Sequence, residues 1–464
     1  MNVYDLIVIG SGPAGEKAAV KAAYFLKKVA IIEKLPLMGG SATYYTVPSK
    51  AFRELAVKTQ KQEMEKKNVI REFLNLKDDL VKLHSETVRE NLVNHGIDIY
   101  QGVASFVDSH HIEVTHEEKK VVIEGENIII AGGVKTLLPN DIPVDGKRVH
   151  IVETLRNITS VPSSICISGA GVIGCEYASI FSALGCKVYL TDERPRMLGR
   201  VDSEIVDYLK SHMKKNGIIF EFEKKITSID VAEDVTIALN DGTEIKVEIL
   251  LVVGRRKSQL KDLHLENAGL EIPDDKIIPV NEYFQTNIPN IYAVGDIVGP
   301  PSLVNTGMDQ GRYAVSQMFH LDDMNSFCMS NMPQGIYTIP EISSVGLTED
   351  AAIEQGLDII VGRAFHGDIA RGMIRKVDYG MLKLIIDKSS EVILGVNIIG
   401  DQATELVHYG VDLVINRKTL KDVINSNFNF PCLHELYKYA AYDGLATIAG
   451  RHMRVHHISK EYKY

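Results

Sequence analysis

The same strand–turn–helix–strand unit occurs twice in this chain, and this repeat limits the fold more than any other feature of the sequence. The first copy runs from an apolar strand at 5–9 to Glu33, and the second runs from an apolar strand at 164–168 to Asp192. In each copy, a glycine-rich turn and a helical stretch separate the first strand from the second. Each copy therefore predicts a βαβ unit with parallel strands.

The two turns share the pattern Gly-x-Gly-x-x-Gly, in which each glycine has its own physical role. The first permits a tight turn, the second lets a pyrophosphate approach the start of the helix, and the third lets helix and strand pack closely. The acid that ends the second strand is placed to accept hydrogen bonds from a ribose. The predicted contacts are Gly10, Gly12, Pro13, Ala14, Gly15, Glu33 and Lys34 in the first copy, and Gly169, Gly171, Val172, Ile173, Gly174, Asp192, Glu193 and Arg194 in the second.

Two such sites predict two bound dinucleotides. A glycine-rich turn alone is weak evidence, but here each turn has its strand, its helix and its terminal acid. A flavin usually stays bound, whereas a nicotinamide coenzyme must come and go. We therefore assign FAD to the first site and NAD or NADP to the second.

Length, charge and cysteine spacing narrow the class of protein. The 464 residues suffice for roughly three domains, and a formal net charge of −10 gives no electrostatic reason to expect nucleic acid or an anionic membrane as partner. The sequence has neither the apolar run of a membrane span nor the start of a secretory signal. Its five cysteines lack Cys-x2-Cys and Cys-x4-Cys spacing, so we expect a cytoplasmic protein without structural disulfides. We predict a solvated tail, not a metal site, around His452, His456 and His457.

Several further strings occur in the order that one known family shows. They are MGG at 38–40, VPSK at 47–50, IAGG at 130–133, VGRR at 253–256 and IYAVGD at 291–296. Together they resemble the pyridine nucleotide–disulfide oxidoreductase family over nearly the whole chain. The longer strings GAGVIGCEYASIF from Gly169, YAVGDIVGPPSL from Tyr292 and GIYTIPEISSVGLTE from Gly335 are most similar to the soluble transhydrogenase branch of that family.

The resemblance implies an α/β fold with two Rossmann-like dinucleotide-binding domains and a C-terminal α+β dimerisation domain. We expect the FAD-binding domain at 1–145 and 275–335, the NAD(P)-binding domain at 146–274, the dimerisation domain at 336–446 and a tail at 447–464. The family forms homodimers in which this last domain completes the partner's active site. Independently, apolar residues at 76, 80, 83, 88 and 92 predict one buried helix face.

This sequence lacks the residues that the disulfide chemistry of the family requires. Family members with a redox disulfide carry Cys-x4-Cys before the Pro-Ser-Lys string, and those positions are Ser41 and Thr46. The general-base histidine that precedes a proline is replaced by Phe430, although the glutamate five residues later is retained as Glu435. A dithiol relay needs both sulfurs and the base together. We therefore expect hydride transfer without a dithiol step.

The resemblance also implies roles for individual residues. Lys50 and Glu176 would pair beside flavin N5, and Glu435 would act in the partner's active site. Asp296 would reach the ribityl hydroxyls of FAD, and a helix starting after Pro301 would point its positive end at the flavin. The other expected cofactor contacts are Gly39, Gly40, Ser41, Thr46, Ala104, Gly133, Gly254 and Gly295.

The coenzyme preference of the second site stays open. Asp192 favours NAD, because a carboxylate accepts from a free 2′-hydroxyl and repels a 2′-phosphate. Arg194 and Arg196 follow at once and could hold that phosphate or lie in a solvated loop. The leading hypothesis is hydride transfer between NADPH/NADP and NADH/NAD through FAD. The alternatives are an NAD(P)H oxidase or diaphorase with quinone or oxygen as acceptor, and a non-catalytic flavoprotein scaffold.

Overall fold

The computed structural model describes residues 2–137, 142–156, 158–254, 256–272, 277–322, 327–328, 332–377 and 379–451. The chain forms two compact units: the first contains residues 1–55, 64–160 and 252–327, and the second contains 56–63, 161–251 and 328–464. Arg255 of the family string and the three histidines of the predicted tail lie outside the described residues. The predicted domain limits stay a prediction.

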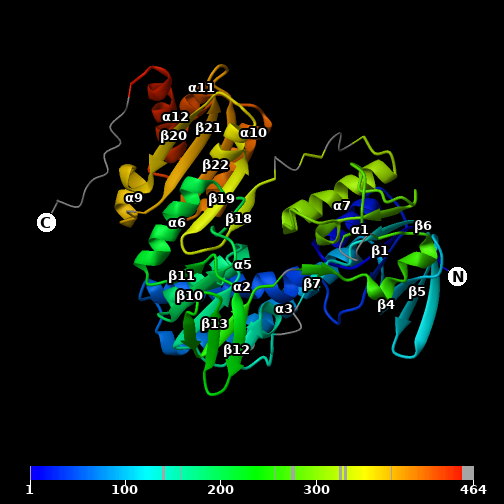
Figure 1. Ribbon diagram of the computed structural model, residues 1–464. Coiled ribbons are helices and arrows are strands. Elements are labelled where there is room, and N and C mark those ends of the chain that lie inside the picture. The colour runs from blue at the N-terminus through cyan, green and yellow to red at the C-terminus, as the bar shows by residue number, and fades with distance from the viewer. Residues whose placement is uncertain are drawn as a thin grey trace. The chain divides into compact units, whose positions relative to one another are not determined.

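The first unit is built around a sheet with the strand order β3-β2-β1-β6-β5-β4, in which β17 also pairs with β6 (Figure 1). Strand β1 is parallel to both of its neighbours. The strands are β1 (Val3–Ile9), β2 (Val29–Glu33), β3 (Asp98–Gln101), β4 (Val103–Phe106), β5 (His111–His116), β6 (Lys119–Ile130), β7 (Val134–Thr136), β8 (Val149–Ile151), β16 (Arg256–Ser258) and β17 (Ile291–Ala293). The helices are α1 (Pro13–Tyr24), α2 (Val47–Gln60), α3 (Lys66–Asn94), α4 (Val152–Leu155) and α7 (Val304–Met318), with a π-helix at Ala42–Thr46.

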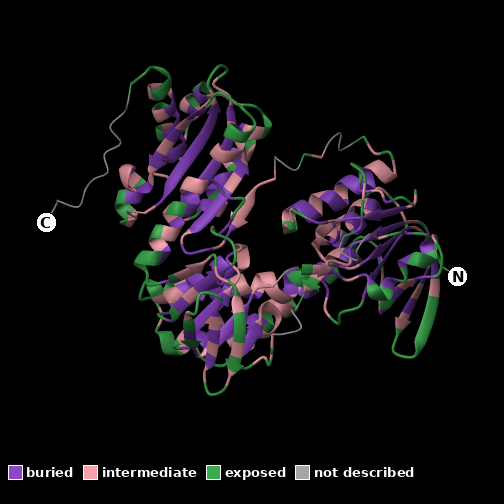
Figure 2. Cartoon of the chain, viewed as in Figure 1, coloured by how far each residue is buried: buried purple, intermediate pink, exposed green. Residues whose placement is uncertain are grey.

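This sheet is buried on both faces, which explains the uninterrupted apolar run of β1. Leu6 and Val8 pack in one hydrophobic cluster with the alanines of α1, whereas Ile7 packs in another on the opposite face. Figure 2 shows the central strands of this sheet as buried. Parallel strands covered on both sides have this composition because neither face meets water.

Small residues let α1 and α7 approach closely. A Cβ added to Gly311 of α7 would lie 2.3 Å from the carbonyl oxygen of Ala14 in α1. Helix α3 also packs on this unit, but the predicted apolar face is partly wrong: Leu83 is 61% exposed. The predicted Val88 and Leu92 are buried, and the buried face also contains Phe73, Lys77 and Ser85, which the spacing did not indicate.

The second unit begins with the second copy of the repeat. Its sheet contains β11-β10-β9-β15 in that order, with β10 parallel to both neighbours, and β12-β13-β14 form an antiparallel meander. The elements are β9 (Ser164–Ser168), α5 (Val172–Ala183), β10 (Lys187–Asp192), α6 (Ser203–Lys215), β11 (Ile219–Phe222), β12 (Ile226–Val231), β13 (Val235–Leu239), β14 (Glu244–Val247) and β15 (Ile249–Val252).

The C-terminal part of the second unit is an antiparallel sheet of order β18-β19-β22-β21-β20 with helices packed on it (Figure 1). Its elements are β18 (Gln334–Ile336), β19 (Glu341–Gly346), α8 (Glu349–Glu354), β20 (Ile359–Phe365), α9 (Ala370–Arg375), β21 (Met381–Asp387), β22 (Ile393–Gly400), α10 (Ala403–Ile415), α11 (Leu420–Asn425) and α12 (Glu435–Ile448). The predicted fold class, two Rossmann-like units followed by an α+β domain, is confirmed.

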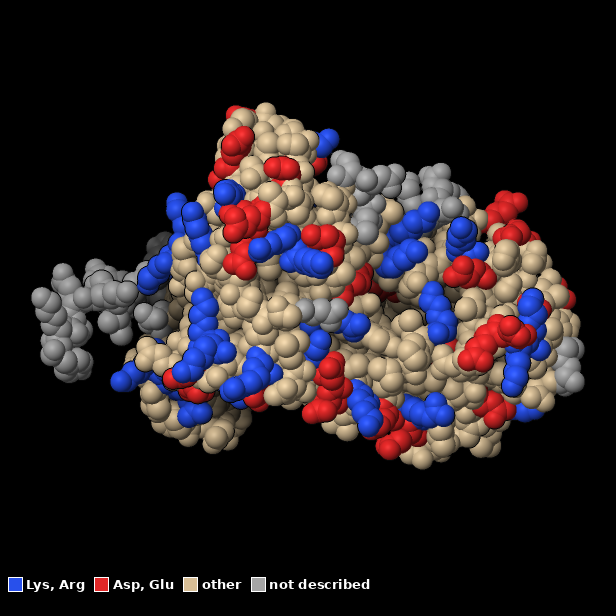
Figure 3. All heavy atoms as spheres, turned by 90° about the horizontal axis from the view of Figure 1, so that it is seen from below, with Lys and Arg blue, Asp and Glu red and all other residues tan. Residues whose placement is uncertain are grey.

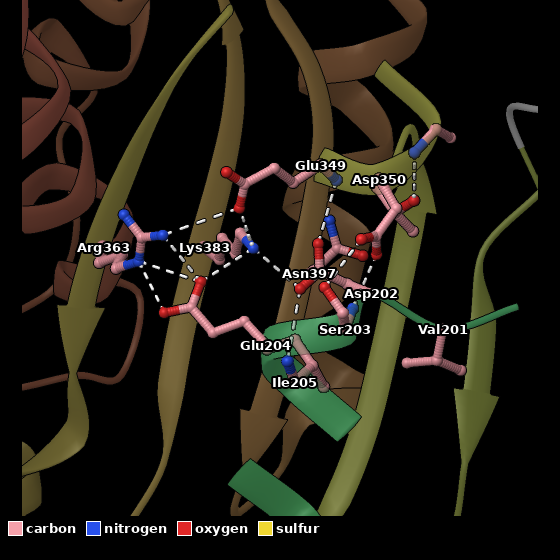
Figure 4. A network of polar contacts seen from close by, with 12 residues as sticks. Val201, Asp202, Ser203, Glu204, Ile205, Glu349, Asp350, Arg363, Lys383 and Asn397 are labelled. Carbon is pink, nitrogen blue, oxygen red and sulfur yellow. Dashed lines mark hydrogen bonds and ion pairs between the residues drawn. The ribbon is translucent and has the colours of Figure 1, made fainter. Parts of the chain in front are cut away.

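A buried lysine joins α6 to this C-terminal sheet (Figure 4). Lys383 of β21 has no exposed side-chain surface, and its Nζ lies 2.9 Å from Asp202, 2.9 Å from Glu204 and 2.6 Å from Glu349. Arg363 of β20 adds a two-pronged contact with Glu204. Burial works to lower the pKa of Lys383, but these carboxylates outweigh it and raise that pKa above its ordinary value. The ammonium therefore stays charged at neutral pH and holds the two elements together.

On the surface, charges of both signs are mixed. On the face in Figure 3, the described Lys and Arg side chains alternate with Asp and Glu rather than gathering by sign. Within the described residues, no helix combines the length and hydropathy needed to cross a membrane, and this includes the 29-residue α3.

Candidate dinucleotide sites

The first glycine-rich turn forms a cradle at the start of α1. Gly10 has a φ of +104°, and a Cβ there would lie 2.5 Å from the carbonyl oxygen of Ala131. A Cβ on Gly15 would lie 2.0 Å from the Gly10 carbonyl oxygen, so helix and strand meet there without a side chain. Pro13 occupies the first turn of α1, and Gly12 caps the helix without a side-chain hydrogen bond. The free amides at this helix start are suited to bind a phosphate.

The loop after Glu33 folds back over this cradle. The Gly39 amide donates to Ser11 Oγ at 3.0 Å, and a Cβ on Gly40 would lie 3.1 Å from the Cα of Gly12. Ser11 thus connects the turn, the terminal acid and the covering loop. The predicted residues Gly12, Glu33, Gly39 and Gly40 therefore lie together.

Glu33 is buried and held by three donors. Its Oε2 accepts from the Ser11 amide at 2.9 Å and from Ser11 Oγ at 2.7 Å, and its Oε1 accepts from the Leu35 amide at 2.8 Å. A carboxylate has about four acceptor sites. Hydrogen bonds within the described residues therefore leave one site on Oε1 for a ribose hydroxyl. Lys34 donates from Nζ to Gln259 Oε1 at 2.8 Å, and its predicted contact with a cofactor stays a prediction.

The second turn repeats this design at the start of α5. Gly169 has a φ of +111°, and a Cβ on Gly174 would lie 1.8 Å from the Gly169 carbonyl oxygen. Gly171 caps α5 without a side-chain hydrogen bond, and an added Cβ there would meet no atom within 4 Å. Val172 and Ile173 form the first turn of the helix. Both cradles therefore fit the pyrophosphate of a dinucleotide.

Asp192 is held by four donors, unlike its counterpart Glu33. The Ala170 amide donates to its Oδ2 at 2.6 Å, and the Arg194 amide donates to its Oδ1 at 2.9 Å. The Arg194 guanidinium adds two bonds, from Nε to Oδ1 at 2.8 Å and from Nη2 to Oδ2 at 2.7 Å. Burial works to raise the pKa of Asp192, but these bonds outweigh it and hold the pKa below its ordinary value.

The remaining residues of this loop do not contact Asp192 through a described hydrogen bond. Arg196 donates from Nη2 to the carbonyl oxygen of Val201 at 2.8 Å. Glu193 is exposed. The two arginines that the sequence placed side by side thus have different partners, and only Arg194 lies on the acid.

Ser41 and Thr46 lie at the two ends of the π-helix that precedes α2. Ser41 caps this π-helix, which ends at Thr46. Ser41 is exposed and Thr46 is half-buried. Within the π-helix, Thr43 Oγ1 is hydrogen-bonded to His84 Nδ1 at 2.7 Å. The five cysteines, all within the described part of the chain, are thiols rather than disulfides.

The three predicted catalytic residues lie in different elements. Lys50 is half-buried in the first turn of α2 in the first unit. Glu176 is buried in α5 of the second unit, where its Oε1 accepts from the Tyr337 amide at 2.9 Å. Glu435 begins α12, and its buried Oε2 has no hydrogen-bond partner among the described residues. The pairing of Lys50 with Glu176 stays a prediction.

Asp296 and the helix after it occupy the other edge of the first cradle. The Gly295 amide donates to Gln310 Oε1 at 2.8 Å, and Asp296 accepts from Arg256 at 3.1 Å. Burial raises the pKa of Asp296, and Arg256 offsets part of that rise. The predicted helix after Pro301 is α7, which starts without a side-chain cap. The buried hydroxyl of Thr306 in its first turn has no partner among the described residues, which fits a cofactor with polar ring atoms.

Three predicted backbone contacts lie in the first unit. Ala104 is buried in β4. Gly133 has a φ of +65° and open space where a Cβ would point. A Cβ on Gly254 would lie 2.8 Å from the Leu137 carbonyl oxygen. Their contacts with cofactors stay predictions.

The sequence reasoning missed several residues that organise these sites. Ser11 and Ala170 occupy the same place in the two turns, and both donate their amide to the terminal acid. The pattern Gly-x-Gly could have indicated this, because its middle residue faces the end of the neighbouring strand. Lys383 was also missed, although a lysine inside the apolar string MLKLIID signals a buried partner.

Known proteins are similar to this chain in sequence and in fold. The model of the pyridine nucleotide-disulphide oxidoreductase family matches residues 4–311, and the model of its dimerisation domain matches residues 332–441. A soluble pyridine nucleotide transhydrogenase of Hahella chejuensis is 37% identical, covering 96% of this chain and 99% of its own. One from Mycobacterium bovis is 36% identical, covering 96% and 97%.

Among solved structures, the HOCl-induced flavoprotein disulfide reductase RclA from Escherichia coli is 26% identical with a TM-score of 0.86, covering 95% of this chain and 99% of its own. LpdA from Mycobacterium tuberculosis, 21% identical with a TM-score of 0.89 and the same coverage, shares the fold. Two dinucleotide cradles and a matched dimerisation domain agree with these findings. The chain therefore belongs to the pyridine nucleotide–disulphide oxidoreductase family, whose members use FAD and NAD(P).

Proposed function

We propose that this chain transfers hydride between NADPH/NADP⁺ and NADH/NAD⁺ through FAD. The observation that carries the proposal is the presence of two cradles of the same design with Ser41 and Thr46 at the positions of the family's redox cysteines. The names of the relatives that match over nearly the full length support it. When bound, FAD supplies a centre that exchanges hydride with a nicotinamide ring.

The residues of the chain bind and orient the two dinucleotides. The free amides at Gly12 and the start of α1 would hold the FAD pyrophosphate, and Glu33 would hold its ribose through the open site on Oε1. The start of α5 at Gly171 would hold the pyrophosphate of NAD(H) or NADP(H). The cover formed by Gly39 and Gly40 favours a resident cofactor in the first cradle, because that cofactor cannot leave without moving the loop.

Lys50 and Glu176 are our candidates beside the reacting atoms. The ammonium of Lys50 would offer positive charge to an electron-rich ring, and the carboxylate of Glu176 would offset the cost of desolvating that ammonium. Ser41 and Thr46 carry hydroxyls, which can donate hydrogen bonds but cannot form a disulfide. Electrons therefore have to leave the protein on a diffusible acceptor.

Reduction of thio-NAD⁺ by NADPH tests this function. We expect turnover by the holoenzyme and a sharp loss of the rate in Lys50→Met, since the positive charge beside the ring is removed. Faster reduction of quinone or oxygen than of thio-NAD⁺ would favour the oxidase or diaphorase. A flavin absorbance that neither coenzyme bleaches would indicate the scaffold.

We also propose that the protein works in the cytoplasm as a homodimer. Relatives named as soluble enzymes and thiols at all five cysteines support the compartment. The dimerisation domain at 332–441 supports the assembly. Two features are then candidates for contact with the partner: Phe430, which is 71% exposed, and Glu435 Oε2, which has no hydrogen-bond partner within the described residues. Light scattering of the purified holoenzyme would reveal a monomer if the assembly is wrong.

A further inference from the structure

The second cradle combines two features that usually exclude each other. An acid at the end of the second strand normally selects NAD by binding the ribose 2′-hydroxyl, whereas an arginine nearby normally selects NADP by binding the 2′-phosphate. Here Asp192 and Arg194 are both present, and they bind each other through two hydrogen bonds. The pair has no net charge, so it neither repels a 2′-phosphate as a lone carboxylate would nor attracts it as a lone arginine would.

The acceptor sites of Asp192 are all in use. Two donors approach each oxygen, from the Ala170 amide, the Arg194 amide and the Arg194 guanidinium. Because a carboxylate has about four acceptor sites, Asp192 has none left for a ribose hydroxyl in this arrangement. Glu33 in the first cradle keeps one. The acid of the second cradle can bind NAD only if a donor leaves.

Arg194 is the donor that can leave. The amides of Ala170 and Arg194 are fixed by the backbone, whereas the Arg194 side chain is 60% exposed. The pair is exposed on the Arg194 side only, because the Asp192 side chain is 6% exposed. Water can therefore solvate the guanidinium when it leaves, and a ribose hydroxyl can take the acceptor sites that it vacates. A guanidinium also has five N–H donors, of which Asp192 uses two, so three remain to bind a phosphate.

We infer that Arg194 determines which coenzyme the second cradle accepts by changing its position relative to Asp192. With NADP(H), Arg194 stays on Asp192 and donates its remaining N–H groups to the 2′-phosphate. With NAD(H), the side chain swings into solvent, and Asp192 accepts from the free 2′-hydroxyl. This inference rests on the proposed function, since it requires both coenzymes to enter the same cradle.

Binding of coenzyme fragments to the oxidised holoenzyme tests the inference without hydride transfer. The probes are 2′,5′-ADP, which carries the phosphate, and 5′-AMP, which carries the free hydroxyl, both titrated by calorimetry. We expect Arg194→Gln to weaken 2′,5′-ADP roughly 10- to 100-fold, the effect of about one charge-assisted hydrogen bond. Binding of 5′-AMP should stay the same or tighten, because Asp192 regains free acceptor sites.

Two further variants sharpen the test. Asp192→Asn should weaken 5′-AMP but not 2′,5′-ADP, because the ribose loses a charged acceptor and the phosphate loses a negative neighbour. Arg196→Gln removes the same charge two residues away, where the side chain donates to a carbonyl rather than to Asp192. It should leave both fragments within about twofold of wild type. Thermal unfolding of each variant checks that the fold is retained.

Two results would overturn the inference: equal weakening of both fragments by Arg194→Gln, or an effect of Arg196→Gln as large as that of Arg194→Gln. The second would mean that the loop attracts phosphate only through its general positive charge. Selective fragment binding without thio-NAD⁺ reduction would reject the proposed function and keep the inference. Turnover with both coenzymes, combined with equal effects of Arg194→Gln on the two fragments, would keep the proposed function and reject the inference.

Discussion

The two cradles share a backbone design but differ in how much of the site the chain itself completes. In the first, Ser11 binds both Glu33 and the covering loop, and Gly40 comes within contact distance of Gly12. In the second, Ala170 has no side-chain hydroxyl that could hold a covering loop, although Gly171, like Gly12 in the first, has open space where a Cβ would point. This difference supports our proposal that the first cradle keeps its nucleotide and the second exchanges it.

The terminal acids show the same contrast in their hydrogen bonds. Glu33 is fixed by backbone amides and a short buried hydroxyl, and it keeps an acceptor site for a ligand. Asp192 is filled by an exposed arginine that can be displaced. A retained cofactor needs an acid that is already in position, whereas a site for two coenzymes needs one whose availability can change.

The largest expected effect is on stability, and it tests the buried ion pair of Lys383 with Asp202, which holds the start of α6 in the second unit. Lys383→Met should lower the free energy of unfolding by about 3–5 kcal/mol, because it leaves the fully buried Asp202 carboxylate without its cation. Glu204 and Glu349 are about one-third exposed and should contribute less. Urea unfolding followed by circular dichroism measures the change. Lys388→Met, an exposed lysine at the end of the same strand region, is the control; a similar loss in both variants would contradict the role of Lys383.

Glycine substitutions then separate folding from binding in both cradles. Gly15→Ala and Gly174→Ala should each destabilise the protein by about 3 kcal/mol, because the new Cβ would clash with a backbone carbonyl. Gly12→Ala and Gly171→Ala should fold normally, since their Cβ meets no protein atom within 4 Å. Thermal unfolding measures the first effect.

Gly12→Ala and Gly171→Ala also test which nucleotide each cradle binds. Gly12→Ala should release FAD, whereas Gly171→Ala should keep FAD and lose nicotinamide coenzyme binding, because each Cβ fills the phosphate position of its own cradle. The flavin absorbance of the purified proteins and a titration with NADPH distinguish the two. Loss of FAD from Gly171→Ala would show that the assignment of the cradles is wrong.

Acid should weaken the anchor of the second unit. Burial works to raise the pKa values of Glu204 and Asp350, but Arg363 and Lys383 at the first and Ser203 at the second hold both below their ordinary values. A lowered folded-state pKa gives stability that is present above the unfolded values of 4.5 and 3.8 and is lost as the pH falls through the folded values. Unfolding free energies measured from pH 6 to about pH 3 should fall in wild type. The slope should be shallower in Lys383→Met; identical slopes would argue against this linkage.

The smallest effect tests the hydroxyl that distinguishes the two turns. Ser11→Ala removes one donor to Glu33 and the acceptor of the Gly39 amide, and it should weaken FAD retention by about 1 kcal/mol. FAD release during dialysis against mild urea measures this. Ala170→Ser places a hydroxyl in the second turn and should not create a permanent site, because no glycine-rich cover follows it. If Ser11→Ala releases FAD at the wild-type rate, the Ser11 hydroxyl does not contribute to the difference between the two cradles.

The features that could be predicted from the sequence are those that depend on residues close together in the chain. The strands, glycine turns and helix starts of both cradles follow from local patterns, and the structure confirms the βαβ units with ends within a few residues. Leu83 shows the limit of periodicity: its spacing matched a buried face, but α3 buries Phe73 and Lys77 instead. The face of a long helix that becomes buried depends on the element that packs against it. The spacing of apolar residues does not identify that element.

The polar contacts of the sites could not be predicted from the sequence, because they depend on how distant parts of the chain fold together. Lys383 meets Asp202 across 181 positions of sequence, so no local pattern could pair them. The pairing of Asp192 with Arg194 is local, but the sequence left open whether Arg194 and Arg196 hold a 2′-phosphate or lie in a solvated loop, and it did not pair either of them with Asp192. A residue two positions after a strand end can turn either way, and only the path of the loop decides.

The buried Lys383 also connects the loop after β10 to the C-terminal sheet. Asp202 ends the loop that carries Arg194, begins α6, and is held by an ammonium on β21. A displacement of β21, for example when two copies associate, would pull directly on the far end of that loop. We therefore expect substitutions around Lys383 to shift the far end of the loop that carries Arg194 and, through Arg194, to change the choice of coenzyme.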